Sequence, residues 1–73
     1  MKRADLIRRV RQAAKRQGRG FEIPREGRQH EVWLCGRTRV AIPRHADVSD
    51  FTAEGIFRDL EAELGNGWWR RRA

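Results

Sequence analysis

Apolar side chains change their spacing twice along this chain of 73 residues. They recur at steps of three and four in residues 6–14, which predicts one amphipathic helix over residues 3–17. Between residues 21 and 42 they come instead in short extended runs, and from residue 53 to 64 the helical spacing returns. The pattern therefore predicts a helix, then strands, then a second helix.

Three strands are expected between the two helices. They cover residues 21–23, 29–35 and 38–42, with turns at 26–28 and 36–37. Pro24 confines the first strand to a sheet edge or a strand end, and Pro43 ends the third strand, because proline lacks the N–H that a ladder needs. We expect an α+β fold of order α-β-β-β-α, with two helices on one face of a three-stranded antiparallel sheet, as in double-stranded-RNA-binding domains.

The second helix is predicted over residues 52–64, with Asp50 or Thr52 as its N-cap and glycines at its end. Gly55 in its first turn costs about 1 kcal/mol relative to alanine, which indicates either a close backbone contact or an unoptimised position. We expect one domain over residues 1–73, with residues 66–73 as a tail rich in tryptophan and arginine. Trp68 and Trp69 can pack on the second helix, contact a partner or stack on RNA, and we favour the first two.

Charge points to a nucleic-acid partner. The chain carries a net charge of +7 from 15 arginines, 2 lysines and 10 acidic residues. A guanidinium group holds phosphate with two parallel hydrogen bonds. Residues 1–19 hold eight basic side chains and one acidic one, whereas residues 47–64 hold six acidic and one basic. The sequence therefore places the phosphate-binding surface toward its N-terminal helix.

Cysteine content and hydropathy bear on location. The single cysteine, Cys35, excludes an internal disulfide and a zinc site made of cysteines alone, which fits a reducing cytoplasm. No apolar run approaches the roughly 18 residues that a membrane-spanning helix needs. We expect a cytoplasmic protein with no membrane partner.

Two histidines are the candidate catalytic residues. His30 opens the predicted second strand and His45 follows the third, and imidazole exchanges protons near neutral pH. Arginines near them in sequence or on the adjoining hairpin are candidate phosphate contacts, namely Arg25, Arg28, Arg37, Arg39 and Arg44. The N-terminal helix adds candidate RNA contacts at Lys2, Arg3 and Arg9. Each of these cations could instead be a solvated surface charge.

Several tracts, in this order and spacing, resemble one known family. They are Lys2-Arg3-Ala4-Asp5-Leu6-Ile7, Gly20-Phe21, Arg25-Glu26-Gly27, His30 with Trp33, Ile42-Pro43-Arg44-His45, and residues 52–64. Together they resemble the HicA toxins of bacterial type II toxin–antitoxin systems. The resemblance implies an mRNA interferase with His30 at the catalytic position and a HicB-type antitoxin as its partner. Arg28-Gln29 depart from the small residues that the family has before this histidine.

A ribonuclease of this kind needs no metal or cofactor, because RNA supplies its own nucleophile in the 2′-hydroxyl. His30 is then the acid–base residue, against the alternative of a solvated histidine at a strand end. His45 is a second proton donor, a phosphate contact or merely a loop cap. Trp33 is expected in the core rather than stacked on a base, and Cys35 is expected to be a small strand residue.

Two other functions remain open. The first is an RNA-binding module of the same fold that does not cut its ligand. Arg28-Gln29 favour it, because they depart from the family's pattern directly before His30. The second is a DNA-binding part of a repressor, which fits the charge but lacks a helix-turn-helix pattern.

Overall fold

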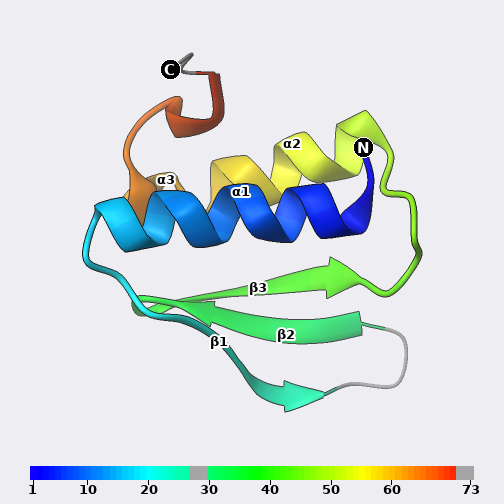
Figure 1. The fold of residues 1–73 in the computed structure, drawn as a ribbon, viewed down its shortest axis with the longest axis horizontal. Coiled ribbons are helices and arrows are strands. Elements are labelled where there is room, and N and C mark those ends of the chain that lie inside the picture. Colours follow the sequence, from blue (N-terminus) through cyan, green and yellow to red (C-terminus); the bar gives the residue numbers. More distant parts are fainter. Residues whose placement is uncertain (27–29, 71–73) are drawn as a thin grey trace.

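The computed structural model describes residues 1–26 and 30–70, with the backbone alone for residues 24–26 and 30. Its elements are α1 (Arg3–Arg16), β1 (Phe21–Glu26), β2 (His30–Cys35), β3 (Thr38–Pro43), α2 (Asp50–Asp59), α3 (Glu61–Leu64) and a 3-10 turn, η1 (Trp68–Arg70). Figure 1 shows the helices together on one face of the sheet. The predicted α+β fold and its order of elements are confirmed.

The three strands form an antiparallel sheet in the order β1-β2-β3. β1 is longer than predicted and carries an irregularity between Glu22 and Arg25, which is the stretch that contains Pro24. β1 lies at an edge, as proline requires. Glu26 belongs to this strand, and the rest of the turn predicted at residues 26–28 lies outside the described residues.

The turn between β2 and β3 depends on Gly36. This glycine has a φ of +60°, and a Cβ placed on it would lie 2.2 Å from Glu63 Oε1. The same carboxylate accepts hydrogen bonds from the Arg37 N–H at 3.3 Å and the Thr38 hydroxyl at 2.9 Å. Glu63 of the short α3 helix therefore stabilises this turn. A larger residue at position 36 would disrupt the turn and displace the Glu63 side chain.

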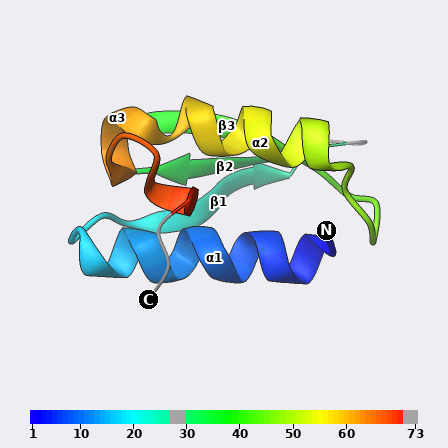
Figure 2. The same cartoon turned by 90° about the horizontal axis from the view of Figure 1, so that it is seen from above.

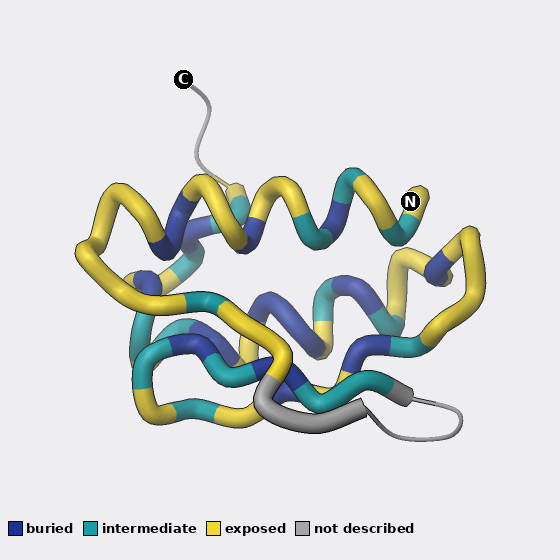
Figure 3. Tube along the Cα trace, turned by 60° about the horizontal axis from the view of Figure 1, so that its bottom comes forward, coloured by how far each residue is buried: buried dark blue, intermediate teal, exposed yellow. Residues whose placement is uncertain are grey.

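The core lies between the sheet and the helices (Figure 3). It is made of the inner stripes of the helices, alternate residues of β2 and β3, and single residues between and after these elements. Its members are Leu6, Val10, Ala13, Ala14, Trp33, Cys35, Val40, Ile42, Val48, Ala53, Ile56, Phe57, Leu60, Leu64 and Trp68. Trp33 is 5% exposed, which confirms its predicted place in the core.

The second helical segment differs from the prediction at its start and in its middle. It begins at Asp50, and its N-cap is Ser49, whose hydroxyl accepts a hydrogen bond from the Thr52 N–H at 3.2 Å. Asp50 and Thr52 are therefore not the cap, because Ser49 is the residue with extended backbone angles before the first turn. The segment is also divided at Leu60, which is fully buried.

Residues 68–70 are part of the packed molecule. Trp68 is 7% exposed, its indole N–H donates to the Phe57 carbonyl oxygen at 2.9 Å, and its ring meets the Phe57 ring edge-on at 5.1 Å. Figure 2 shows η1 folded back toward α1 beside α3. Of the alternatives predicted for the two tryptophans, packing on the second helix is therefore confirmed for Trp68. Residues 71–73 lie outside the described residues.

Candidate nucleic-acid interface

The backbone brings the two histidine positions to one end of the sheet. His30 is the first residue of β2, and its register partner is Pro43, the last residue of β3. His45 follows two residues later and is exposed. The imidazole of His30 lies outside what the structure describes. The two predicted acid–base residues, which fifteen positions separate in the sequence, therefore belong to the same end of the sheet.

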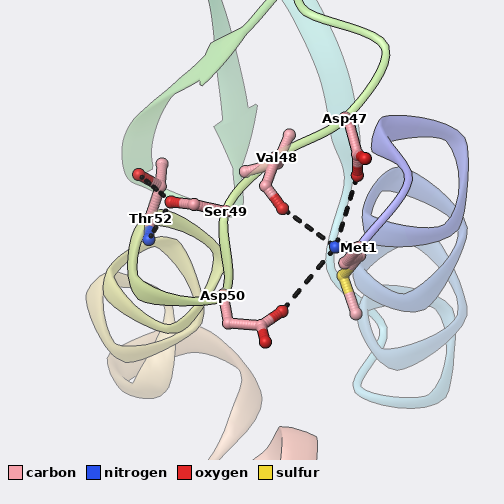
Figure 4. Close-up of polar contacts among 6 residues, drawn as sticks. All are labelled: Met1, Asp47, Val48, Ser49, Asp50 and Thr52. Atoms are coloured by element: carbon pink, nitrogen blue, oxygen red, sulfur yellow. Dashed lines mark hydrogen bonds and ion pairs between the residues drawn. The ribbon is translucent and has the colours of Figure 1, made fainter.

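The loop that carries His45 is fastened to the start of α1. The Arg3 N–H donates to the Ala46 carbonyl oxygen at 2.9 Å, and the Val48 N–H donates to the Met1 carbonyl oxygen at 2.8 Å. The Met1 amino group donates to the Val48 carbonyl oxygen at 2.9 Å and lies 3.5 Å from an Asp47 carboxylate oxygen (Figure 4). These contacts fix the His45 loop relative to the basic helix.

Arg3 joins the two strands at the same end. Its Nε donates to the Pro43 carbonyl oxygen at 2.8 Å, and its Nη2 forms an ion pair with Glu31, the residue after His30. Glu31 also accepts a hydrogen bond from the Trp33 indole at 3.2 Å. Both side chains of the ion pair are mostly buried, at 23% and 15% exposed. Arg3, predicted to contact RNA, is therefore engaged within the fold.

A groove of about 750 Å³ runs between α1 and the β1 side of the sheet. The residues that line this α1 groove are Arg3, Ala4, Ile7, Arg8, Arg11, Gln12, Lys15, Ile23, Glu31 and Trp33. Four of these side chains are cationic and one is anionic, so the groove carries a positive balance. A concave, positively charged surface concentrates polyanions near it.

Aromatic rings underlie this groove. Phe21 and Trp33 stack with their ring centroids 4.5 Å apart. The Arg11 guanidinium lies 5.9 Å from the Phe21 centroid and 5.8 Å from that of Trp33, which is cation–π range. Arg11 is exposed while its charge rests against the rings. The arrangement holds one guanidinium at a fixed place on the groove wall.

The other predicted arginines are dispersed. Arg44 is exposed and adjoins His45. Arg39 is exposed in β3, where it alternates with the buried Val40 and Ile42, so it points to the sheet face away from the helices. Arg37 sits at the β2–β3 turn, about 17 Å along β2 from His30 for a strand of six residues. A single clamp made of all these guanidinium groups is therefore not formed.

The remaining predicted contacts fall into two groups. Lys2 and Arg9 are exposed on the N-terminal helical segment but do not line the groove. Arg28 and the guanidinium of Arg25 lie outside the described residues. Sequence reasoning also overlooked Glu31. Its position one residue after His30 and two before Trp33, on the same strand face as that tryptophan, was the available signal.

Cys35 is a core residue. It is fully buried, and burial raises the pKa of its thiol, with Glu63 raising it further and Arg19 opposing them. A raised pKa keeps the sulfur protonated near neutral pH and thus poorly nucleophilic.

Comparison with known proteins assigns no relative. No protein-family model matches the chain, and no curated protein and no solved structure matches it significantly. In the part of the chain that the structure describes, no helix combines the length and the apolar character needed to cross a membrane.

Proposed function

We propose that this chain is an endoribonuclease toxin of the HicA type, which cuts mRNA in the cytoplasm and is silenced by a HicB-type antitoxin. The proposal rests on the sequence tracts that resemble that family and on the charge of the N-terminal helix. The observation that carries it is the α1 groove, whose cationic wall reaches, through Arg3, the sheet end where His30 and His45 lie.

RNA binding follows from this arrangement. The phosphate backbone lies along α1, where Arg11 and Lys15 contribute charge that is not needed to close the core, while Arg8 is paired with Asp5 at 2.5 Å. The apolar floor at Ile23 and Ile7 accommodates ribose or base surface. An RNA strand held in the groove passes the start of β2, because Glu31 lines the groove and is the second residue of β2.

The cleavage step uses the 2′-hydroxyl of the RNA. His30, as general base, accepts the proton of that hydroxyl while its oxygen bonds to the adjacent phosphorus. The bond from phosphorus to the 5′-oxygen of the next nucleotide breaks, and the departing oxygen receives a proton from a general acid. His45 is the candidate acid because its loop lies beside the first residue of β2. Guanidinium groups near the two histidines stabilise the negative charge that develops on the phosphate. The candidate next to His45 is Arg44, which directly precedes it in the sequence.

A second candidate is a module that holds RNA without cutting it. It is favoured by Arg28-Gln29, which precede His30 in place of the small residues of the HicA pattern. The α1 groove serves this function equally well, because binding needs the charges but not the imidazole.

Cleavage of a purified transcript in EDTA tests the proposal. The chain is expected to cut the transcript, whereas His30→Ala is expected to bind it with equal affinity and cut it about 100-fold to 10,000-fold more slowly. His45→Ala is run beside it to test the acid. Equal binding with no cutting by the unmodified chain would establish the binding module, and full cutting by His30→Ala would reject the role of this histidine.

A further inference from the structure

The outward side of α2 carries two features that no contact within the described chain explains. Phe51 is 91% exposed, and the only other large apolar side chain exposed among the described residues is Ile23, at 37%. Gly55, one turn after Phe51, has no described atom within 4 Å of the place where a Cβ would lie, apart from its chain neighbours and the backbone of its own helix. An exposed phenyl ring and a glycine inside a helix are both unfavourable for an isolated chain.

These two residues form a ridge beside a hollow. Positions four apart share one face of a helix, so Phe51 and Gly55 are neighbours on the surface of α2. The hollow has a volume of about 350 Å³, which leaves room for an aromatic ring. Its lining, which we call the α2 patch, consists of Phe51, Thr52, Glu54, Gly55 and Arg58. The α2 patch therefore carries both a protruding phenyl ring and a hollow large enough for such a ring.

We propose that the α2 patch binds a second copy of this chain, with the two α2 helices antiparallel about a twofold axis. The phenyl ring of Phe51 of each copy then enters the hollow over Gly55 of the other. A surface that carries both halves of a contact is self-complementary, which is the requirement of a twofold interface. Glycine at position 55 allows the two backbones to approach closely there.

Charge supports the antiparallel arrangement. When Phe51 lies opposite the partner's Gly55, Arg58 lies opposite the beginning of the partner's α2. Asp47 and Asp50 stand there, with side chains 84% and 100% exposed. The Met1 amino group lies 3.5 Å and 3.7 Å from one carboxylate oxygen of each, so the two carboxylates and this one cation together leave a negative charge at that end. A parallel arrangement would instead oppose Arg58 to its own copy. Antiparallel helices also place the partial charges of their termini favourably.

The interface is small. One helix face buries less than the roughly 1,200 Å² of a standard stable interface, so the dimer is expected to be weak and concentration-dependent, with a dissociation constant on the order of micromolar or weaker. The inference does not rest on the proposed ribonuclease function, because α2 and the α1 groove share no lining residue.

Sedimentation equilibrium of the full chain from about 10 µM to about 1 mM tests the proposal. Phe51→Ser and Gly55→Leu are each expected to raise the dissociation constant at least about tenfold. The matched controls are Ile23→Ser, which removes an exposed apolar side chain elsewhere, and Gly20→Leu, which adds the same atoms at another glycine in open space. Both controls are expected to associate as the unmodified chain does.

Mixing two charge variants tests the register. Arg58→Glu places like charges opposite each other in its own dimer, and so does Asp50→Lys. A one-to-one mixture pairs opposite charges at both ends of the helix pair, so it is expected to associate at least about tenfold more tightly than either variant alone. Circular dichroism of each variant checks that α2 remains folded.

Three results would overturn the proposal. The first is an unmodified chain that stays monomeric throughout the concentration range. This result would overturn the proposal even if a different protein, such as an antitoxin, covered the α2 patch. The second is association that the patch variants and the controls change equally. The third is a mixture of the charge variants that associates no better than its components.

Discussion

The helices α1 and α2 cover the same face of one sheet, yet their outward faces have little in common. Toward the sheet both present an apolar stripe, with Leu6 and Val10 on α1 and Ile56 and Phe57 on α2 all nearly inaccessible. Beside its apolar stripe, α1 carries the cations that line a groove against β1 and β2, whereas the outward face of α2 carries one exposed phenyl ring beside a glycine. The core dictates the inner stripes, so the outward faces are where the two helices can be adapted to different partners.

Trp68→Ala tests the packing on the α2 side and is expected to lower the free energy of unfolding more than any other substitution considered. Trp68 fills space against Phe57 and donates to its carbonyl oxygen, so its removal leaves a cavity and leaves that oxygen with the Leu60 N–H, at 3.2 Å, as its donor. We expect the free energy of unfolding to fall by about 3 to 5 kcal/mol, as measured in urea. Trp69→Ala is the matched control, because Trp69 is only partly buried, and it is expected to cost less. An equal, small loss for both would show that residues 68–70 are not packed.

Arg3→Ala tests the end of the sheet where α1 meets the histidine positions. The substitution removes a hydrogen bond to the Pro43 carbonyl oxygen and leaves the mostly buried Glu31 without its ion-pair partner. We expect a loss of about 1.5 to 3 kcal/mol in chemical denaturation. Arg9→Ala, an exposed cation of the same helix, is expected to change stability by less than about 0.5 kcal/mol. Equal stability of both variants would mean that Arg3 is a surface charge.

Reversing charges inside and outside the α1 groove tests whether RNA binding depends on that groove. Arg11→Glu with Lys15→Glu alters the α1 groove, and Arg58→Glu with Arg70→Glu changes the net charge equally on residues outside it. The α1 pair is expected to weaken transcript binding about tenfold and to lower the salt slope by about 0.7 per lost phosphate contact. The second pair is expected to have a smaller effect. If the two pairs weaken binding equally, net charge rather than the groove determines RNA affinity.

Ser49→Ala has the smallest expected effect. It removes the only side chain that caps a helix N-terminus in the part of the molecule described, and α1 has no equivalent side-chain cap at Lys2. Loss of such a cap costs about 1 kcal/mol, which thermal unfolding detects. Ser49→Asp, which keeps an acceptor, is expected to restore most of it. No change in either variant would mean that α2 starts without help from this hydroxyl.

The sequence predicted the fold well because its apolar spacing is unambiguous. The steps of three and four in α1 and the short extended runs in β2 and β3 correspond closely to the elements observed. The break at Leu60 was not predictable, because the apolar stripe continues through it and only tertiary packing decides where the helix divides. Ser49 was missed because serine, threonine and aspartate all occur near the helix start and each can act as a cap.

The candidate site was predictable only in part. The hairpin of β2 and β3 was predicted, and its register pairs His30 with Pro43, two residues before His45. The groove was not predictable, because α1, Ile23 and Glu31 contribute to it from three separate parts of the chain. Arg37 was named a candidate because it belongs to the predicted hairpin, and the structure places it at the turn of that hairpin, at the opposite end of β2 from His30.

The proposed cleavage of RNA depends on activation of the 2′-hydroxyl by side chains of this chain. Its decisive test is to incubate the purified chain in EDTA with an RNA oligonucleotide that contains a linkage the chain cuts, and with the same oligonucleotide lacking the 2′-hydroxyl at that linkage. Both oligonucleotides are expected to bind, and only the first is expected to be cut there. Cleavage of both at the linkage, or binding of both with no cleavage of either, would contradict the proposal.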